Sequence, residues 1–315
     1  MSSKHLISLR SYAAIAFSNS VHRRFLTLTR RARRPFLIRA QTSAFLEQAF
    51  LEMCNKLGIN SLIECGAYDA ELSRKFLRKS ADRHAWAFEI NPLVYSHYKS
   101  INALPNLRYL NLGLSDAAED SYLMIPRRTP AAWSMEASLS NRKEKEDTDL
   151  VPVKLETLDM VMKSDFILGE TALWIDVEGH SAKLLAGAEK ILNDPRCLLL
   201  HIEVQDIEIW EKEFVADEIC EVLNNFDFKP ILMDCPLADL FNIIFIKSDY
   251  ETVVSKEIQF YWYSIGGLTV PRFETISIRE GISRLKRLLL RINSDKWRKL
   301  IHSVAAKMGS KSSKY

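Results

Sequence analysis

The stretch TALWIDVEGHSAKLLAGAEKIL, residues 171–192, decides the fold because two acids join an apolar run to a helical pattern. The run ends at Asp176 and Glu178, a glycine follows, and apolar residues then recur at helical spacing. We therefore predict a strand over 172–178 and a helix over 181–193. In such a strand both acids point to the same side, since side chains alternate. A surface turn explains one acid, whereas two at alternate positions indicate a functional site.

Strands and helices alternate on both sides of this stretch. Between helical patterns, short apolar runs predict strands over 60–66, 84–90, 107–114 and 197–204. Such alternation predicts a parallel sheet with right-handed crossovers and helices on both faces. The last expected strands, 228–233 and 240–247, are separated only by DCPLAD, which is too short for a crossover helix. They must be antiparallel neighbours, so the fold class is α/β with a mostly parallel sheet that ends in an antiparallel strand.

Departures from the alternation set the expected domain limits. Residues 119–155 contain SYLMIP and LVPVKL, which we expect to pair as an extra hairpin around the charged loop NRKEKEDTD. Ser43 is expected to cap the first helix of the sheet domain, and Gly58 to end it. We predict a basic N-terminal arm over 1–42, an α/β domain over 43–250 and a C-terminal extension with basic amphipathic helices over 251–315.

Charge is distributed unevenly along the chain, whose 315 residues carry +3 in total. Residues 1–46 hold Lys4 and eight arginines with no acid, and so carry +9. Residues 279–315 hold eleven lysines and arginines against two acids, which is again +9, so the middle carries −15. The sequence therefore describes an acidic body with two basic ends.

Cysteine usage and hydropathy bear on the compartment. The five cysteines are scattered without a CxxC pair, which argues against a disulfide framework or a zinc site and favours a reducing compartment. The sequence contains no run of 18 apolar residues. We expect a cytoplasmic protein, with peripheral membrane contact as a further expectation. The arginine-rich and serine-rich N-terminus also has the composition of a mitochondrial transit peptide, which is the alternative.

Acids follow nearly every expected strand, at the edge where ligands bind in open parallel sheets. The first strand ends at Glu64 and Gly66 without the G-x-G-x-x-G that a dinucleotide requires, and Glu64 and Asp69 would repel a phosphate. Glu89 ends the second strand, where a carboxylate accepts hydrogen bonds from ribose hydroxyls. S-adenosylmethionine has that ribose together with a positive sulfonium and an ammonium. It is therefore the expected cofactor, and the expected contact residues are Glu64, Gly66, Ala67, Tyr68, Glu89, Ile90, Asn91, Ser115 and Asp116.

The motifs LIECGAYDAELSRKF, AFEINPLVYSHY, NLGLSD, VKLETLDMVM and LWIDVEGHSAKLLAGAEKIL resemble, in order and spacing, the FkbM-type methyltransferases. The resemblance covers roughly residues 60–247. It implies a class I S-adenosylmethionine-dependent methyltransferase with a Rossmann-like sheet, generally an O-methyltransferase that acts on hydroxyls of sugars or secondary metabolites. Two positions depart from the family's D-x-G-A-N-x-G motif: Tyr68 stands for the Asn and Ala70 for the second Gly. Glu64 replaces the Asp and keeps its charge.

Methyl transfer to a hydroxyl calls for alignment and for a base that takes the hydroxyl's proton. The expected candidates for this base are the strand-end residues Asp176, Glu178, His180, His201 and Glu203. Structural alternatives remain, since Glu178 and His180 suit the start of the following helix and His201 suits the core. No metal is expected, although Asp176 and Glu203 sharing a divalent ion is an alternative. A binding or membrane-adaptor protein without turnover is the other alternative.

The basic C-terminal segment has its own pattern. ISRLKRLLLRI places Ile282, Leu285, Leu289 and Ile292 on one face with arginines and lysines around it, and Trp297 follows. This is the pattern of a helix that lies on an anionic membrane. Packing of the apolar stripe against the domain or a partner subunit is the alternative. The acidic body and the lack of a recognisable reading module argue against nucleic acid. The expected acceptor is a small molecule or a glycan.

Overall fold

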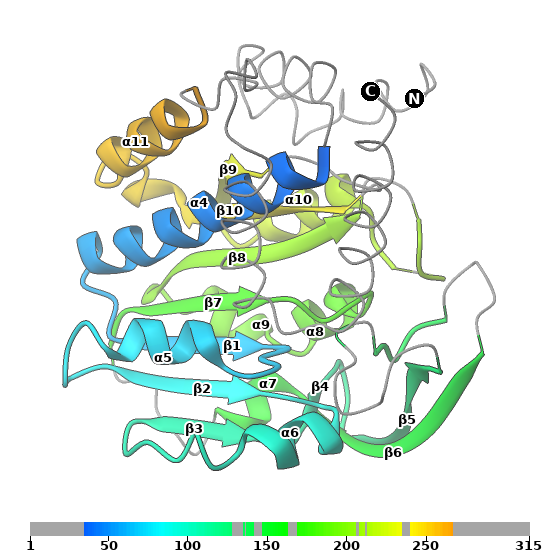
Figure 1. Cartoon of the computed structure of the whole chain (residues 1–315). Coiled ribbons are helices and arrows are strands. Elements are labelled where there is room, and N and C mark those ends of the chain that lie inside the picture. Colours follow the sequence, from blue (N-terminus) through cyan, green and yellow to red (C-terminus); the bar gives the residue numbers. More distant parts are fainter. Residues whose placement is uncertain are drawn as a thin grey trace, which may run out of the picture.

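The structure is a computed structural model, which describes residues 35–127, 135, 137–141, 147–162, 169–205, 208–211, 213–234 and 240–266 (for 35–38, the backbone only). A seven-stranded sheet forms the centre (Figure 1), in the order β3-β2-β1-β7-β8-β10-β9. Its strands are β1 (Ser61–Cys65), β2 (His84–Phe88), β3 (Leu107–Leu110), β7 (Thr171–Ile175), β8 (Cys197–Gln205), β9 (Phe228–Met233) and β10 (Leu240–Lys247).

The register confirms the predicted mostly parallel sheet. β1 runs parallel to β2 and β7, and β7 runs parallel to β8. β10 pairs antiparallel with both β8 and β9, as the short connection before it required. This order, with an antiparallel strand inserted next to the edge, is the class I arrangement that the sequence led us to expect. The burial of β1 agrees with this arrangement. All five of its residues are buried, as expected for a central strand that is covered on both faces.

Helices cover both faces of this sheet (Figure 1), with α4 and α5 over one face and α8, α9 and α10 over the other. Their bounds, with those of the remaining helical segments, are α4 (Pro35–Lys56), α5 (Glu71–Leu77), α6 (Pro92–Tyr98), α7 (Leu158–Val161), α8 (Ser181–Ala186), α9 (Glu189–Asn193), α10 (Ala216–Asn224), the 3-10 turn η2 (Ser248–Tyr250) and α11 (Ser255–Gly266). Pro92 opens α6 at its first position, and the Asn91 side chain accepts the Leu93 N–H, so both residues suit the start of this helix.

A second, three-stranded sheet lies beyond the carboxyl ends of the parallel strands (Figure 1). It consists of β4 (Gly113–Leu114), β6 (Thr148–Glu156) and β5 (Glu119–Pro126), and β5 and β6 form the expected antiparallel pair. Its own small core contains Leu123, Ile125, Val153 and Leu155. This sheet therefore places apolar side chains over the edge at which the sequence predicts the site.

Several predicted boundaries were wrong. α4 begins at Pro35, so Ser43 lies inside the helix and does not cap it; its hydroxyl oxygen lies 2.9 Å from the Arg39 carbonyl oxygen. Gly58 follows the helix end with a φ of 68°, as predicted. Ala70 occupies the position before α5 and makes no capping bond, whereas an Asp69 side-chain oxygen accepts the Glu71 N–H at 2.8 Å.

Two longer elements are divided. The predicted strand 107–114 contributes β3 to the main sheet and β4 to the second. The predicted helix 181–193 is two helices, which part at Gly187, where a Cβ atom would lie 1.9 Å from the Ser115 carbonyl oxygen. The basic helices predicted beyond residue 278 lie outside the described residues, and the division at 42 and 250 stays a prediction.

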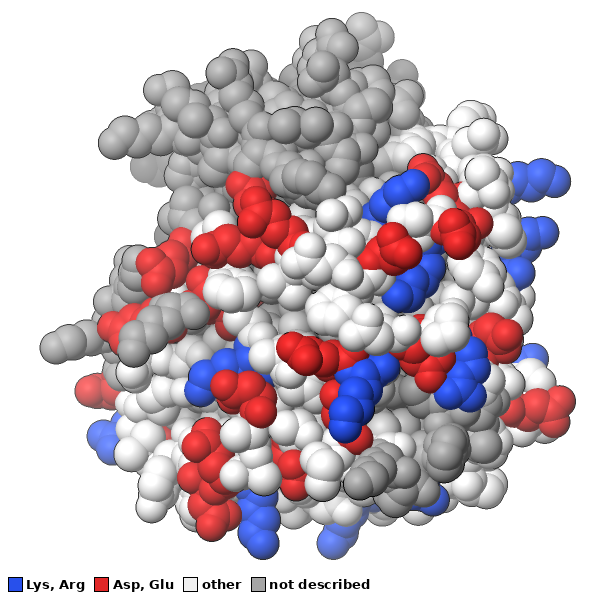
Figure 2. Space-filling view, turned by 180° about the vertical axis from the view of Figure 1, so that it is seen from behind, with Lys and Arg blue, Asp and Glu red and all other residues white. Residues whose placement is uncertain are grey.

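The surface behind the sheet carries both signs of charge. Figure 2 shows acidic and basic side chains interspersed on the face opposite α4 and α5. The net negative charge of the middle of the chain is therefore not gathered into one patch on this face. Among the described residues, no helix combines the length and apolar character needed to cross a bilayer.

Candidate active site

A cavity of about 270 Å³ lies at the carboxyl ends of β1, β2 and β7. Its size is close to the lower end of the ~300–1,000 Å³ typical of small-molecule sites. The loop after β1, the end of β2, the turn after β7 and the second sheet contribute to its wall, with side chains from α4 and α5 at one side. The position agrees with the rule that ligands bind beyond the carboxyl ends of parallel strands.

The loop after β1, residues 66–70, is termed the glycine loop. Gly66 has a φ of 81°, and a Cβ atom there would lie 1.8 Å from the Asp176 carbonyl oxygen. Tyr68 and Ala70 also have positive φ values, 47° and 54°. These are the positions where the family motif has Asn and Gly, the residues that tolerate this conformation best. Tyr68 and Ala70 therefore differ from the family motif in their side chains, while the backbone of the loop keeps the left-handed conformation at both positions.

Neighbouring side chains hold the glycine loop in this conformation. The Tyr109 hydroxyl donates to the Tyr68 carbonyl, and the Arg74 guanidinium donates to the Asp69 carbonyl. Asn102 donates to the same Asp69 carbonyl at 3.1 Å. Bonds to two consecutive carbonyls offset the cost of the left-handed conformation, which is ~1–2 kcal/mol per non-glycine residue. The loop is thus prepared for a ligand without the usual glycines.

Two buried carboxylates flank the glycine loop. Glu64 accepts bonds from the Ser73 N–H at 3.0 Å and hydroxyl at 2.5 Å, and burial raises its pKa to about 8. Glu89 accepts the N–H groups of Tyr68 at 2.8 Å and Asn91 at 2.7 Å, and burial raises its pKa to about 7. Each Glu89 oxygen keeps a second lone pair, so the carboxylate fits a ribose diol. A cationic ligand would favour the ionised form of both acids, which fits S-adenosylmethionine.

The turn after β7, residues 176–180, is termed the acid turn. β7 ends at Ile175, so Asp176 and Glu178 follow the strand and do not belong to it. Glu178 has a φ of 46°, and its carbonyl accepts the Ser138 hydroxyl at 2.5 Å. Gly179 packs so closely on Trp210 that a Cβ atom would lie 2.2 Å from the indole ring. The two acids share a site, as predicted, but the turn brings them together and strand alternation does not.

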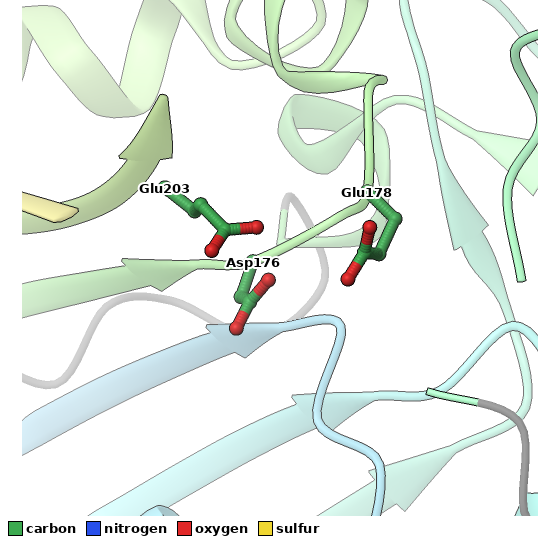
Figure 3. Close-up of side chains that lie close together, drawn as sticks. All are labelled: Asp176, Glu178 and Glu203. Carbon is green, nitrogen blue, oxygen red and sulfur yellow. The ribbon is translucent and has the colours of Figure 1, made fainter. Parts of the chain in front are cut away.

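Three carboxylates converge beside the acid turn (Figure 3): Asp176, Glu178 and, from β8, Glu203. Each offers an oxygen that lies within 4.8 Å of the others. We call this set the acid trio. Burial raises the pKa of Asp176 to about 6, and the Arg39 guanidinium opposes that shift. Burial and the neighbouring Asp176 raise the pKa of Glu203. Carboxylates with raised pKa values suit proton transfer near neutral pH.

A trio of this kind has the oxygen ligands that divalent cations prefer. It also has its own cation, because an Arg39 guanidinium nitrogen lies 3.5 Å from a Glu203 carboxylate oxygen. Three acids beside a resident guanidinium do not by themselves identify a metal site. The shared ion therefore stays an alternative, and no step of the mechanism depends on it.

The two candidate histidines differ in their surroundings. His180 lines the cavity and its Nε2 lies 3.0 Å from the Ser115 hydroxyl, which also donates to Asp116 at 3.0 Å. Burial lowers the pKa of His180 to about 4, so its ring is neutral at pH 7. His201 is 2% exposed and stacks on Trp174 with ring centroids 3.4 Å apart. This placement favours the alternative that the sequence left open, a histidine of the core.

The cavity brings together most of the predicted site residues. Glu64, Gly66, Ala67, Tyr68, Glu89, Ile90, Asp176, Glu178 and His180 line it. Glu203 lines a smaller cavity that it shares with Glu178. Four predicted residues line neither cavity: Asn91, Ser115, Asp116 and His201. The Asn91 side chain caps α6 and the Ser115 hydroxyl bonds His180, so both support residues of the wall.

Other residues of the site were not predicted. Glu47 from α4 and Lys75 from α5 line the cavity and pair at 2.7 Å. Apolar contributors from the second sheet and the segment after β5 include Leu123 and Met135. Arg39 approaches the acid trio from α4. No signal at strand ends reveals these residues, because the packing of α4, α5 and the second sheet places them there.

The comparisons with known proteins agree with this arrangement. Residues 64–230 match the methyltransferase FkbM domain, which is more than half of the chain. No curated protein is similar enough to count as a relative.

Similar solved structures include precorrin-6y C5,15-methyltransferase from Geobacter metallireducens, 8% identical over 64% of this chain and 86% of that chain, with a TM-score of 0.35. Another is 1,6-didemethyltoxoflavin-N1-methyltransferase from Burkholderia thailandensis, bound to 1,6-didemethyltoxoflavin and S-adenosylhomocysteine. It is 11% identical over 67% of this chain and 91% of that chain, with a TM-score of 0.31. Likenesses this distant carry no weight for the function of this chain.

The domain match runs from the end of β1 to the start of β9, and it includes the glycine loop, Glu89 and the acid turn. The resemblance seen in the sequence is thereby confirmed. The chain belongs to the FkbM methyltransferase family and is an S-adenosylmethionine-dependent methyltransferase.

Proposed function

We propose that the enzyme methylates a hydroxyl oxygen of a small molecule or glycan, with a carboxylate of the acid trio as the base. The observation that carries this proposal is the position of Asp176 and Glu178. Both line the same cavity as Gly66 and Glu89, so they would face a cofactor held by those two residues. A hydroxyl is a poor nucleophile while it keeps its proton, and a positioned base contributes ~10²–10⁴-fold to the rate.

The residues divide the work between binding and proton transfer. Glu89 would accept hydrogen bonds from the ribose hydroxyls of the cofactor, and the backbone of the glycine loop would hold the rest of it. When bound, S-adenosylmethionine supplies a methyl group on a sulfonium, and this carbon–sulfur bond breaks as the oxygen–carbon bond forms. A carboxylate of the trio, Asp176 being the first candidate, takes the hydroxyl's proton. The fixed acid turn supports this role, since alignment supplies much of the rate.

Incubation with methyl-labelled S-adenosylmethionine and fractionated cell extract tests this proposal. We expect the label in a methyl ether of a low-molecular-weight or glycan fraction, which resists mild base and is identified by mass spectrometry. Label on nitrogen or carbon, or no transfer at all from the wild-type chain, would contradict O-methylation. A binding measurement with NAD provides the control. We expect NAD not to bind, because the glycine loop lacks the glycines that a pyrophosphate needs.

We also propose that the basic segment 279–315 brings the enzyme to an anionic membrane surface facing the cytoplasm. The support is its charge of +9 together with the apolar stripe of Ile282, Leu285 and Leu289. Co-sedimentation with anionic and neutral vesicles tests it, for the full chain and for a truncation after residue 278. Binding that requires anionic lipid, weakens with salt and needs the segment is expected. Equal recovery in the supernatant for both chains would contradict it.

A further inference from the structure

Arg39 brings a positive charge to the acid trio from a distant part of the chain. It lies near the start of α4, and its side chain is 14% exposed. One guanidinium nitrogen lies 3.5 Å from a Glu203 carboxylate oxygen, and the other bonds the Asp234 carboxylate. Arg39 and Asp234 both lie outside residues 64–230, which match the family domain. This contact is therefore a feature of this chain that the family match does not describe.

Asp234 holds Arg39 in a fixed place. Its side chain is fully buried, directly after β9. Asn242 donates to it through its backbone N–H and its side-chain amide, both at 2.8 Å, and the Ser43 hydroxyl donates at 2.6 Å. Four donors, counting Arg39, leave this carboxylate little freedom to act as a base. It serves as an anchor, and the planar guanidinium transmits that fixed position to Glu203.

The second effect of Arg39 is electrostatic. Glu203 faces Asp176 and Glu178 in the trio, with Asp234 as a further acid nearby, and Arg39 opposes them. Like charges this close disfavour simultaneous ionisation, so part of the trio would stay protonated near neutral pH. The guanidinium lowers the pKa of both Glu203 and Asp176 against the effect of their burial. A trio without Arg39 would therefore hold its protons to higher pH.

We propose that Arg39 is a positioning residue for methyl transfer. Anchored by Asp234, its guanidinium orients Glu203 and offsets the charge of the trio, so that a deprotonated carboxylate faces the acceptor hydroxyl. This inference rests on the proposed function, and it makes α4 part of the catalytic unit. Arg39 does not touch the reacting atoms; it acts through Glu203.

The test compares Arg39→Met with the wild type in methyl transfer from labelled S-adenosylmethionine to the extract fraction that the wild type labels. We expect kcat to fall about 100-fold, as for misplacement of a catalytic group, while the KM for the cofactor changes by about twofold or less. The acid limb of the pH profile of kcat should move to higher pH. Arg39→Lys keeps the positive charge but loses the planar guanidinium that bonds two carboxylates at once. We therefore expect its kcat to be about tenfold higher than that of Arg39→Met.

A folding defect is the foreseeable complication, because Arg39→Met leaves Asp234 buried without its cation. The double variant Arg39→Met with Asp234→Asn removes both charges, so its fold should be retained. Its kcat should stay low and its pH profile shifted. A double variant with wild-type kcat and pH profile would overturn the proposal.

Arg83→Met is the matched control. Arg83 is 6% exposed and bonds Phe76 and Asn55, and it precedes β2 at the opposite edge of the sheet. We expect it to lower thermal stability without moving kcat or the pH profile. A shift as large as that of Arg39→Met would show that any lost buried guanidinium has this effect, and would overturn the role of Arg39. A wild-type chain that transfers no methyl group would overturn the proposed function as well.

Discussion

The glycine loop and the acid turn follow neighbouring strands, β1 and β7, and both use positive φ values, yet they are stabilised differently. In the glycine loop Tyr68 and Ala70 adopt the left-handed region, and Tyr109, Arg74 and Asn102 bond the loop's carbonyls. In the acid turn Glu178 adopts it between Asp176 and a glycine packed on an indole ring. Hydrogen bonds to the backbone carbonyls of the glycine loop therefore hold this first region in shape.

The second region directs carboxylates into the cavity. Asp176 and Glu178 line it, and with Glu203 they converge on one point. We therefore propose that cofactor binding depends on the backbone shape of the glycine loop together with Glu89, whereas proton transfer depends on the side-chain charge of the acid turn. Substitutions in the two regions should fail in different ways.

Gly66→Ala should have the largest effect on binding. Its Cβ atom would lie 1.8 Å from the Asp176 carbonyl oxygen, so the contact between the two regions must open. We expect a loss of ~3 kcal/mol or more in the free energy of unfolding, from overpacking and strain together, and no measurable cofactor binding in calorimetry. Gly58→Ala is the control, because Gly58 also has a positive φ, 68°, but has nothing within 4 Å of its Cβ position. Equal losses in the two variants would contradict the close contact.

Glu89→Ala should weaken S-adenosylmethionine binding by ~1–3 kcal/mol, since a charged acceptor for two hydroxyls is lost. Glu89→Gln keeps the shape and one acceptor oxygen, so its loss should be smaller. Isothermal calorimetry with S-adenosylmethionine, S-adenosylhomocysteine and NAD provides the measurement. Unchanged affinity in Glu89→Ala would remove this carboxylate from the cofactor site.

Buried acids of both regions make the stability of the cofactor-free protein depend on pH, since burial also raises the pKa of Asp176 to about 6. Burial raises the pKa of Glu64 to about 8 and of Glu89 to about 7, from 4.5. Groups with a raised pKa in the folded state contribute stability below pH 4.5 that is lost as the pH rises through the folded pKa. We therefore expect the free energy of unfolding to fall between about pH 5 and pH 8 in urea titrations. Glu64→Gln should make this decrease smaller. A free energy of unfolding that rises between pH 5 and pH 8 would contradict the raised pKa values of these two acids.

Ala70→Gly should have the smallest effect. Glycine relieves a φ of 54°, but it removes a fully buried methyl group and adds freedom to the unfolded chain. These contributions oppose one another, so the melting temperature should change by no more than the equivalent of ~1 kcal/mol. A strong gain in stability or affinity would mean that neighbouring bonds do not offset the strain of the glycine loop.

Much of the fold could be predicted from the sequence because the strands are short, apolar and bounded by clear breaks. β9 and β10 begin and end at the predicted residues, and their short connection fixes their direction. Boundaries that depend on tertiary contacts could not be predicted. Ser43 looks like a helix cap, yet α4 begins at Pro35, and Ser43 and Arg39 both bond the buried Asp234 from within the helix.

Part of the candidate site could also be predicted from the sequence, namely the acids that follow the strands. Acids after strands identified Glu64, Glu89, Asp176 and Glu178, since the carboxyl ends of parallel strands meet at one edge. Arg39 could not be predicted as a site residue, because it is one of eight arginines in the basic segment 1–46. Only the packing of α4 brings this arginine to Glu203.

The role of an acid-turn carboxylate as the base is tested most directly by single-turnover methyl transfer in Asp176→Asn. Calorimetry on the same preparation measures S-adenosylmethionine binding, and Glu178→Gln is assayed in parallel. We predict a rate ~10²–10⁴-fold below wild type with cofactor affinity and melting temperature nearly unchanged. In the wild type the rate should rise with pH through about 6, as Asp176 loses its proton. Wild-type rates in both variants, at all pH values, would contradict this role.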